Sequence, residues 1–137
     1  MQQSTIVELF TEADKLAHSE QPQRAADLYK TWIALNGTSP LLHAAYFNYG
    51  VALSRIGDHA GAINALRASI RLKSDFYAPY INLGRALEDS GQLGMAVSEW
   101  LALVNSLPTV NGDAIKHKLI VLQQLGRVLE NNNSDAA

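Results

Sequence analysis

Cysteine is absent from this chain of 137 residues, which excludes disulfide bonds and thiolate metal sites. The absence also permits the cytoplasmic location that we expect. No apolar run approaches the roughly 18 residues that a membrane helix needs. Residues 1–20 combine neither a basic start nor an apolar block, so we expect no signal peptide and no membrane partner.

A surplus of charge of one sign is also missing. The chain has 11 Lys and Arg against 13 Asp and Glu, and both signs are scattered along it. A general nucleic-acid binder needs a basic stripe, so we expect no nucleic-acid partner. The four histidines are dispersed, and neither a P-loop nor a nucleophile-elbow motif occurs. We therefore expect no metal, no cofactor and no catalytic residue.

What the chain does contain is an internal repeat. The stretch YFNYGVALSRIGDHAGAI at 46–63 returns as YINLGRALEDSGQLGMAV at 80–97, and Gly50 recurs as Gly84 after 34 residues. Within each copy the apolar residues lie three or four positions apart, which is typical of one helical face. The alternation that marks β-strands is absent. The sequence therefore predicts an all-α fold.

The recurring positions match the tetratricopeptide repeat pattern of large residue, Leu-Gly, large residue, Ala-x₃-aromatic and Pro. In the clearest copy they are Tyr80, Leu83, Gly84, Leu87, Ala96, Trp100 and Pro108, and in the preceding copy Tyr46, Tyr49, Gly50, Leu53, Ala62 and Leu66. The chain thus resembles the tetratricopeptide repeat family over about residues 5–130. The resemblance implies a right-handed solenoid of antiparallel helix pairs, with about three repeats and an unpaired C-terminal helix.

The repeat register predicts one domain over residues 1–130. Its repeats are expected at about 5–37, 41–76 and 77–110, with a half repeat at 113–130 and a polar tail at 131–137. The expected helices are 4–18, 22–36, 40–56, 59–72, 77–90, 93–106 and 113–130.

Small residues and caps indicate how these helices meet and end. Gly50 is small where two helices of a pair must approach closely. The glycines of the RIGDH and DSGQL segments, Gly57 and Gly91, suit left-handed C-terminal caps. Ser39-Pro40 is expected to begin the third helix, with serine as N-cap and proline in the first helical position.

Polar residues recur in the same register. Asn48 returns as Asn82, and Gln124 takes the corresponding place in the half repeat. In the tetratricopeptide repeat family this face of each first helix lines a concave groove. The resemblance therefore implies a groove containing Thr11, Asn48, Arg55, Asn82, Arg85, Asp89, Gln124 and Arg127.

A column of side-chain amides suits one kind of binding in particular. An amide both donates and accepts hydrogen bonds, so it can pair with a peptide backbone whatever the peptide's sequence. The alternative is that each asparagine is solvated or bonds within its own fold. We predict a non-catalytic module that binds a protein or peptide partner in its concave groove.

Another class of the family binds the acidic C-termini of chaperones through Lys, Arg and Asn. Here apolar residues, Phe10, Phe47 and Ile81, stand where that class carries lysine or asparagine. The sequence therefore favours binding of the peptide backbone over binding of an acidic terminus.

Two other functions remain open. The stretches INLGRALEDSGQLGMAVSEW and HKLIVLQQLGRVLE resemble repeats that precede the catalytic region in bacterial SPINDLY-like protein O-GlcNAc transferases. That resemblance implies the substrate-recognition segment of a longer glycosyltransferase. The other possibility is a self-assembly module, in which helix 113–130 forms a homodimer through an exposed face that carries Leu119, Val121, Leu122, Leu125 and Val128.

Overall fold

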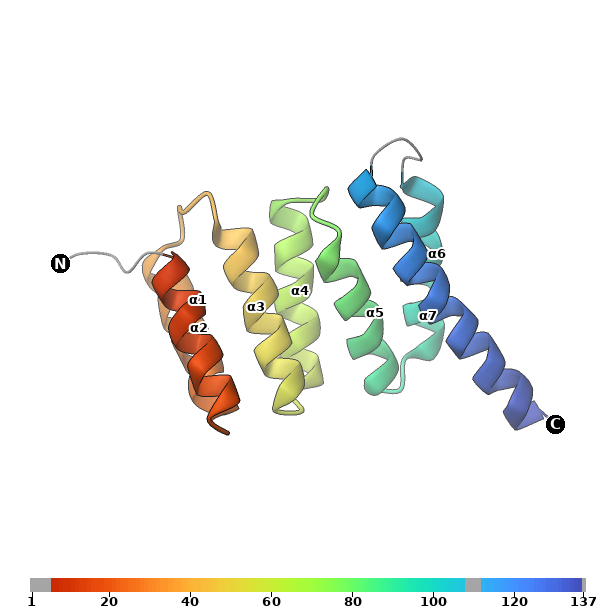
Figure 1. Cartoon of the computed structure of the whole chain (residues 1–137), viewed down its shortest axis with the longest axis horizontal. Helices are drawn as coiled ribbons and strands as arrows, with labels where there is room; N and C mark the ends of the chain where they lie inside the picture. Colours follow the sequence, from red (N-terminus) through yellow and green to blue (C-terminus); the bar gives the residue numbers. More distant parts are fainter. Residues whose placement is uncertain (1–5, 108–111, 137) are drawn as a thin grey trace. The chain divides into compact units, whose positions relative to one another are not determined.

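The computed structural model describes residues 6–107 and 112–136, and this part of the chain contains helices and no strand (Figure 1). The helices are α1 (Ile6–His18), α2 (Pro22–Leu35), α3 (Leu42–Arg55), α4 (His59–Leu72), α5 (Ala78–Asp89), α6 (Leu93–Ser106) and α7 (Gly112–Ala136). The all-α prediction is confirmed. Pro108, which we placed in the repeat pattern, lies outside the described residues.

The helices belong to two compact units, Met1–Pro79 and Tyr80–Ala137. In the first unit α1 packs on α2, α2 on α3, and α3 on α4. In the second unit α6 packs on α7, and α5 contacts both of them through side chains described below. Each unit therefore contains helices that pack on their neighbours in sequence, as a helical repeat requires.

Glycine makes the close approach within helix pairs possible. A Cβ atom on Gly50 of α3 would lie 2.7 Å from Cγ of Leu66 in α4, and one on Gly84 of α5 would overlap the Trp100 ring of α6. Leu66 and Trp100 are fully buried. The recurring glycine is thus explained by the large side chain that the second helix places against it.

The turns between paired helices also follow the repeat. Gly57 and Gly91 have φ angles of 82° and 85°, a left-handed conformation that other residues adopt at a steric cost. Asp58 then caps α4, because its Oδ1 accepts a hydrogen bond of 2.9 Å from the Gly61 amide. The predicted glycine caps are confirmed.

The start of α3 differs from the prediction. The helix begins at Leu42 instead of residue 40, and Leu41 occupies the N-cap. Ser39 lies in the turn before it, where its Oγ accepts a 3.2 Å bond from the Leu41 amide. The Ser39-Pro40 pair therefore makes the turn that leads into the helix and does not cap it.

The last helix departs from the prediction in two ways. α7 continues beyond residue 130 to Ala136, since no Gly or Pro follows Gly126 to interrupt it. In addition, Val121, Leu125 and Val128 are buried within the chain, so our expectation that they belong to an exposed face was wrong. These three share one face of α7, whereas Leu119 and Leu122 lie beside it and are exposed.

Candidate functional site

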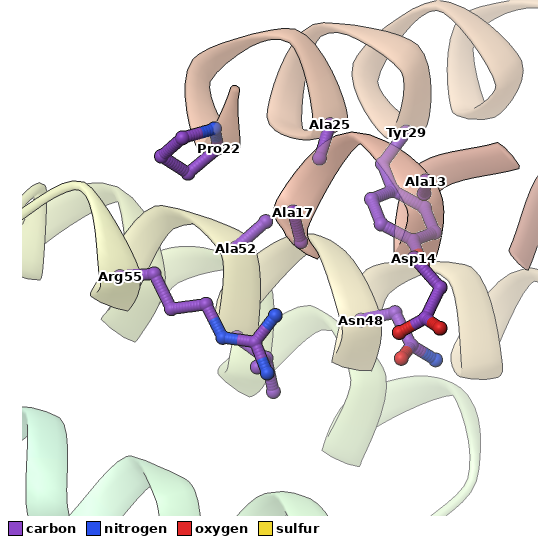
Figure 2. A pocket seen from close by; sticks show the side chains of 10 residues that line it. Ala13, Asp14, Ala17, Pro22, Ala25, Tyr29, Asn48, Ala52 and Arg55 are labelled. Carbon is purple, nitrogen blue, oxygen red and sulfur yellow. The ribbon is translucent and has the colours of Figure 1, made fainter. Parts of the chain in front are cut away.

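An open hollow of about 380 Å³ lies on the first unit, between α1, α2 and α3 (Figure 2). Small residues of these helices form much of its wall. Asp14, Tyr29, Asn48 and Arg55 add the groups that can bond to a ligand. The remaining lining residues are Ala13, Ala17, Pro22, Ala25, Val51 and Ala52. The hollow thus combines a narrow apolar wall with a few polar groups, as binding sites commonly do.

Helix periodicity brings the α3 residues of the hollow together. Asn48 and Arg55 lie seven residues apart, which is two helical turns, and so they share a face. Asn48 Nδ2 donates a 3.0 Å hydrogen bond to the Ala44 carbonyl oxygen one turn earlier, which holds the amide against its own helix. That bond uses one of the two amide N–H groups, and the amide also carries an acceptor oxygen.

The Tyr29 hydroxyl lies within the electrostatic influence of both Asp14 and Arg55. Burial and, to a lesser extent, the nearby Asp14 carboxylate together raise the pKa of Tyr29 to about 12, while Arg55 opposes the shift. Its hydroxyl therefore stays protonated at physiological pH. In Figure 2 the Tyr29 ring of α2 reaches toward Asp14, whose carboxylate lies near the Asn48 amide. A carboxylate, an amide and a guanidinium thus border one opening.

Aromatic residues next to the predicted groove pack within the fold. Phe10 lies against Tyr29 with ring centroids 6.0 Å apart, and Phe47 meets Phe76 edge to face at 5.4 Å. These contacts give both phenylalanines a packing role in the first unit. They place apolar rings, and no additional cation, beside the polar residues of α1 and α3.

The second unit has its own polar cluster. Arg127 of α7 makes a bidentate ion pair with Glu88 of α5, with Nη1–Oε2 at 2.9 Å and Nη2–Oε1 at 2.7 Å. Gln124 Oε1 accepts two further bonds from the same guanidinium, at 3.3 and 3.1 Å. Hydrogen bonds from Arg127 hold the pKa of Glu88 below its ordinary value, although partial burial opposes the shift, and Arg85 lowers the pKa further. The hydrogen bonds to Glu88 and, to a smaller extent, the charge of Asp89 raise the pKa of Arg127, although burial opposes the shift.

The Glu88–Arg127 pair makes a testable contribution to stability. Glu88→Gln should lower the free energy of unfolding at neutral pH by at most about 1 kcal/mol, because both side chains are partly solvated. The folded-state pKa of Glu88 is depressed, so this contribution is present above the ordinary pKa and is lost as the pH falls through the folded-state value. Urea unfolding of both proteins at neutral and acidic pH measures it. A difference that persisted undiminished in acid would contradict the pairing.

The structure brings only some of the predicted groove residues together. Asn48 and Arg55 line the hollow, whereas Thr11 is exposed beside it and donates a 2.8 Å bond to Val7 in its own helix. In the second unit Asn82 and Gln124 are half-buried, Arg85 and Asp89 are exposed, and Arg127 is bound by Glu88. Whether these residues bind a partner stays a prediction.

Two groups that define the hollow and the cluster were not among the predicted groove residues. Asp14 follows Thr11 by three residues and so lies on the same helical face, a signal that was available. Glu88 could not be paired with Arg127 in advance, because the two are 39 positions apart and belong to helices of different repeats.

Within residues 6–107 and 112–136, no group of three or more His, Cys, Asp or Glu side chains could hold a metal ion. No helix in that part of the chain is both long and apolar enough to cross a membrane.

Comparison with known proteins identifies the fold. Residues 43–76 match the family model described as tetratricopeptide repeat. The first TPR domain of Spaghetti (RPAP3), solved with the HSP90 peptide SRMEEVD, is similar at 18% identity, with 92% of this chain and 99% of that chain covered and a TM-score of 0.64. The described helices have the tetratricopeptide repeat (TPR) fold. This confirms the helical-repeat fold that the resemblance implied.

Other TPR structures are similar to a comparable degree. The second TPR domain of human RPAP3, solved with the HSP70 peptide SGPTIEEVD, is 19% identical over 84% of this chain and 92% of that chain, with a TM-score of 0.63. A crystal structure of MamA is 22% identical over 91% of this chain and 58% of that chain, with a TM-score of 0.61. At these identities the likeness establishes the fold. The search of curated proteins gave no match.

Proposed function

We propose that this chain is a non-catalytic protein-interaction module and that the hollow of its first unit receives part of a peptide. The observation that carries the proposal is the hollow itself, where Asp14, Asn48 and Arg55 border one opening. Two similar TPR domains were solved with chaperone peptides, which supports a peptide as the ligand class.

The chemistry of the hollow suits a peptide backbone. The Asn48 amide can pair with a peptide group as donor and as acceptor, Arg55 can donate to a carbonyl oxygen, and Asp14 can accept from an amide N–H. Helices hold all three residues, so little freedom is lost when a ligand binds. Because backbone groups are common to all peptides, we expect binding that tolerates different sequences.

An acidic C-terminus is the competing ligand within the same class. A site for it needs several cations, but the hollow has one arginine and a carboxylate on its rim. Phe10 and Phe47 pack against aromatic neighbours beside it. We therefore expect a peptide such as SRMEEVD to bind no better than unrelated peptides of equal length.

A binding experiment tests the proposal. The double variant Asn48→Ala/Arg55→Ala should weaken binding of SRMEEVD and of unrelated peptides about five- to a hundredfold, because each lost hydrogen bond contributes roughly 0.5–1.5 kcal/mol. Fluorescence titration against a panel of labelled peptides measures the loss.

The matched control is Asn64→Ala/Arg71→Ala, which removes the same residue types from exposed positions of α4 outside the hollow. This control should bind as the wild type does, and urea melts should show that all three proteins are folded. Equal affinities for the wild type and the hollow variant would refute the proposal. A loss confined to SRMEEVD would favour recognition of an acidic terminus instead.

We propose that the second unit adds a further contact through Asn82 and the exposed Arg85. Asn82→Ala should weaken the same peptides about two- to tenfold, the effect of one hydrogen bond. Arg127 is bound by Glu88 and Gln124 within the chain, so Arg127→Ala should act on stability more than on affinity. The reverse order of effects would assign peptide binding to the guanidinium of Arg127.

Membership in a longer glycosyltransferase stays a prediction from sequence resemblance, as does the cytoplasmic location. The natural gene product tests the first of these. An open reading frame that continues into a nucleotide-sugar-binding domain would support it, and a stop codon after residue 137 would refute it.

A further inference from the structure

An apolar groove lies on the second unit. Its lining comes from α6 and α7 and is almost wholly apolar: Val97, Leu101, Leu122, Leu125, Gly126, Val128 and Leu129. Three of these leucines are strongly exposed, with Leu101 at 47%, Leu122 at 45% and Leu129 at 62%. Such a surface in a monomer indicates an interaction site.

The exposed apolar residues of α7 form a regular line along the helix. This exposed stripe consists of Ile115, Leu119, Leu122, Gly126 and Leu129. Its members are separated alternately by four and three residues, the spacing with which one helix packs along another in a coiled coil. A second line, Ala114, Val121, Leu125 and Val128, is buried against the chain's own unit. α7 therefore has two apolar faces, of which its own unit covers one.

The earlier helix pairs show what belongs on the exposed stripe. Gly126 corresponds by repeat register to Gly50 and Gly84, which are covered by Leu66 and Trp100 of the next helix. A Cβ on Gly126 would meet nothing within 4 Å. The residue three positions later is 6% exposed in α3 (Leu53) and 1% in α5 (Leu87), but 62% in α7 (Leu129). The stripe thus corresponds to the surface of α3 and α5 on which the second helix of each pair packs.

None of the chain's described residues packs over the exposed stripe as the second helix does in the earlier repeats. α3 and α5 are followed by Gly57 and Gly91, whose positive φ angles turn the chain back toward its own pair. The corresponding position is Asn133, which lies within α7, and the backbone there stays helical to Ala136. The helix therefore continues past the turn position and leaves the stripe open to a further helix.

We propose that the occupant is α7 of a second copy of this chain, packed antiparallel in a symmetric dimer. With the two-fold axis near residue 124, Leu122 of each copy lies over Gly126 of the other, as Leu66 lies over Gly50 within the chain. Leu119 of each copy meets Leu129 of the other. The stripe is thus self-complementary, as a two-fold interface requires.

Charge favours the same orientation. Lys116 and Glu130 are exposed on one flank of the stripe. In the antiparallel register Lys116 of one copy lies about two residues, or 3 Å along the helix axis, from the level of Glu130 of the other, so opposite charges come close twice. In a parallel pair Lys116 of one copy would lie about 21 Å along the helix axis from Glu130 of the other, so these opposite charges could not meet. Flanking charges of this kind set the orientation of helix pairs.

Sedimentation equilibrium from micromolar to millimolar protein tests the dimer. The wild type should dimerise reversibly, and Leu122→Lys/Leu129→Lys should raise the dimer dissociation constant by at least about thirtyfold, the effect of losing interface anchors. Gly126→Leu should also abolish the dimer, because it fills the space above the glycine, and should leave the monomer folded. Leu35→Lys, at an equally exposed leucine of α2, is the control and should dimerise normally.

A charge exchange tests the orientation. Lys116→Glu and Glu130→Lys should each weaken the dimer about two- to fivefold, and the two together should restore it. A wild type that stays monomeric at every concentration would overturn the proposal and leave another protein as the occupant. A dimer unaffected by Gly126→Leu would place the interface elsewhere, and failure of the double exchange to restore binding would overturn the antiparallel register.

Discussion

Replacing Trp100 by alanine should lower the free energy of unfolding by about 3–5 kcal/mol, the range for removing a large aromatic side chain from a core. Trp100 is fully buried in α6 and fills the space above Gly84 of α5. Because the total stability of a domain is commonly 5–15 kcal/mol, this loss would bring the second unit close to unfolding. Urea unfolding followed by circular dichroism at 222 nm, the usual helix band, measures it.

The control for this variant is Trp32→Ala. Trp32 is also a buried tryptophan, at 8% exposure, but it belongs to α2 in the first unit. Its loss should destabilise the first unit and leave the α5–α6 contact intact. A mild effect of Trp100→Ala, below about 1 kcal/mol, would show that the tryptophan is not the side chain that packs this helix pair.

Gly84→Leu should destabilise by about 1–3 kcal/mol or more, since the added side chain must displace the Trp100 ring. Gly126→Leu is the matched substitution, because Gly126 has the same place in the repeat but open space above it. Glycine is a poor helix residue, so this second change should stabilise the folded monomer by up to about 1 kcal/mol. The two substitutions should therefore have opposite signs in urea unfolding at low protein concentration.

The double variant Gly84→Leu/Trp100→Ala separates packing from propensity. If the two residues touch, leucine can occupy part of the space that the indole leaves, and the combined loss should be smaller than the sum of the single losses. Strict additivity would contradict the close approach of α5 and α6. So would a Gly84→Leu variant as stable as the wild type.

Much of the fold could be predicted from the sequence because the residues that form each contact recur at the same spacing in successive repeats. Gly50 and Gly84 predicted the close approach of the two helices in each pair, and Gly57 and Gly91 predicted the turn between them. The ends of α3 and α7 were less predictable. Ser39 and Pro40 suit a turn as well as a cap, and the polar residues after 130 carry no apolar period although their backbone is helical.

The candidate site could be predicted only in part. Helix periodicity shows which residues share a face of one helix, but it does not show which residues of other helices lie near them. The resemblance to the tetratricopeptide repeat family implied that Asn48 and Arg55 share a groove, and both line the hollow. The partners across helices, Asp14 and Tyr29, depend on how α1 and α2 pack on α3. The same limit applied to α7, where the sequence could not show that Val121 and Leu125 face inward while Leu122 faces out.

The most direct test of the proposed function is a nuclear magnetic resonance titration of the isotope-labelled chain with SRMEEVD and with an unrelated peptide of equal length. Both peptides should shift the amide signals of Asp14, Asn48 and Arg55, together with the side-chain amide of Asn48, and to a similar extent. Signals of exposed α4 residues such as Asn64 and Arg71 should stay unchanged. Shifts that leave the hollow untouched, or no shifts at all with either peptide, would contradict peptide binding at this site.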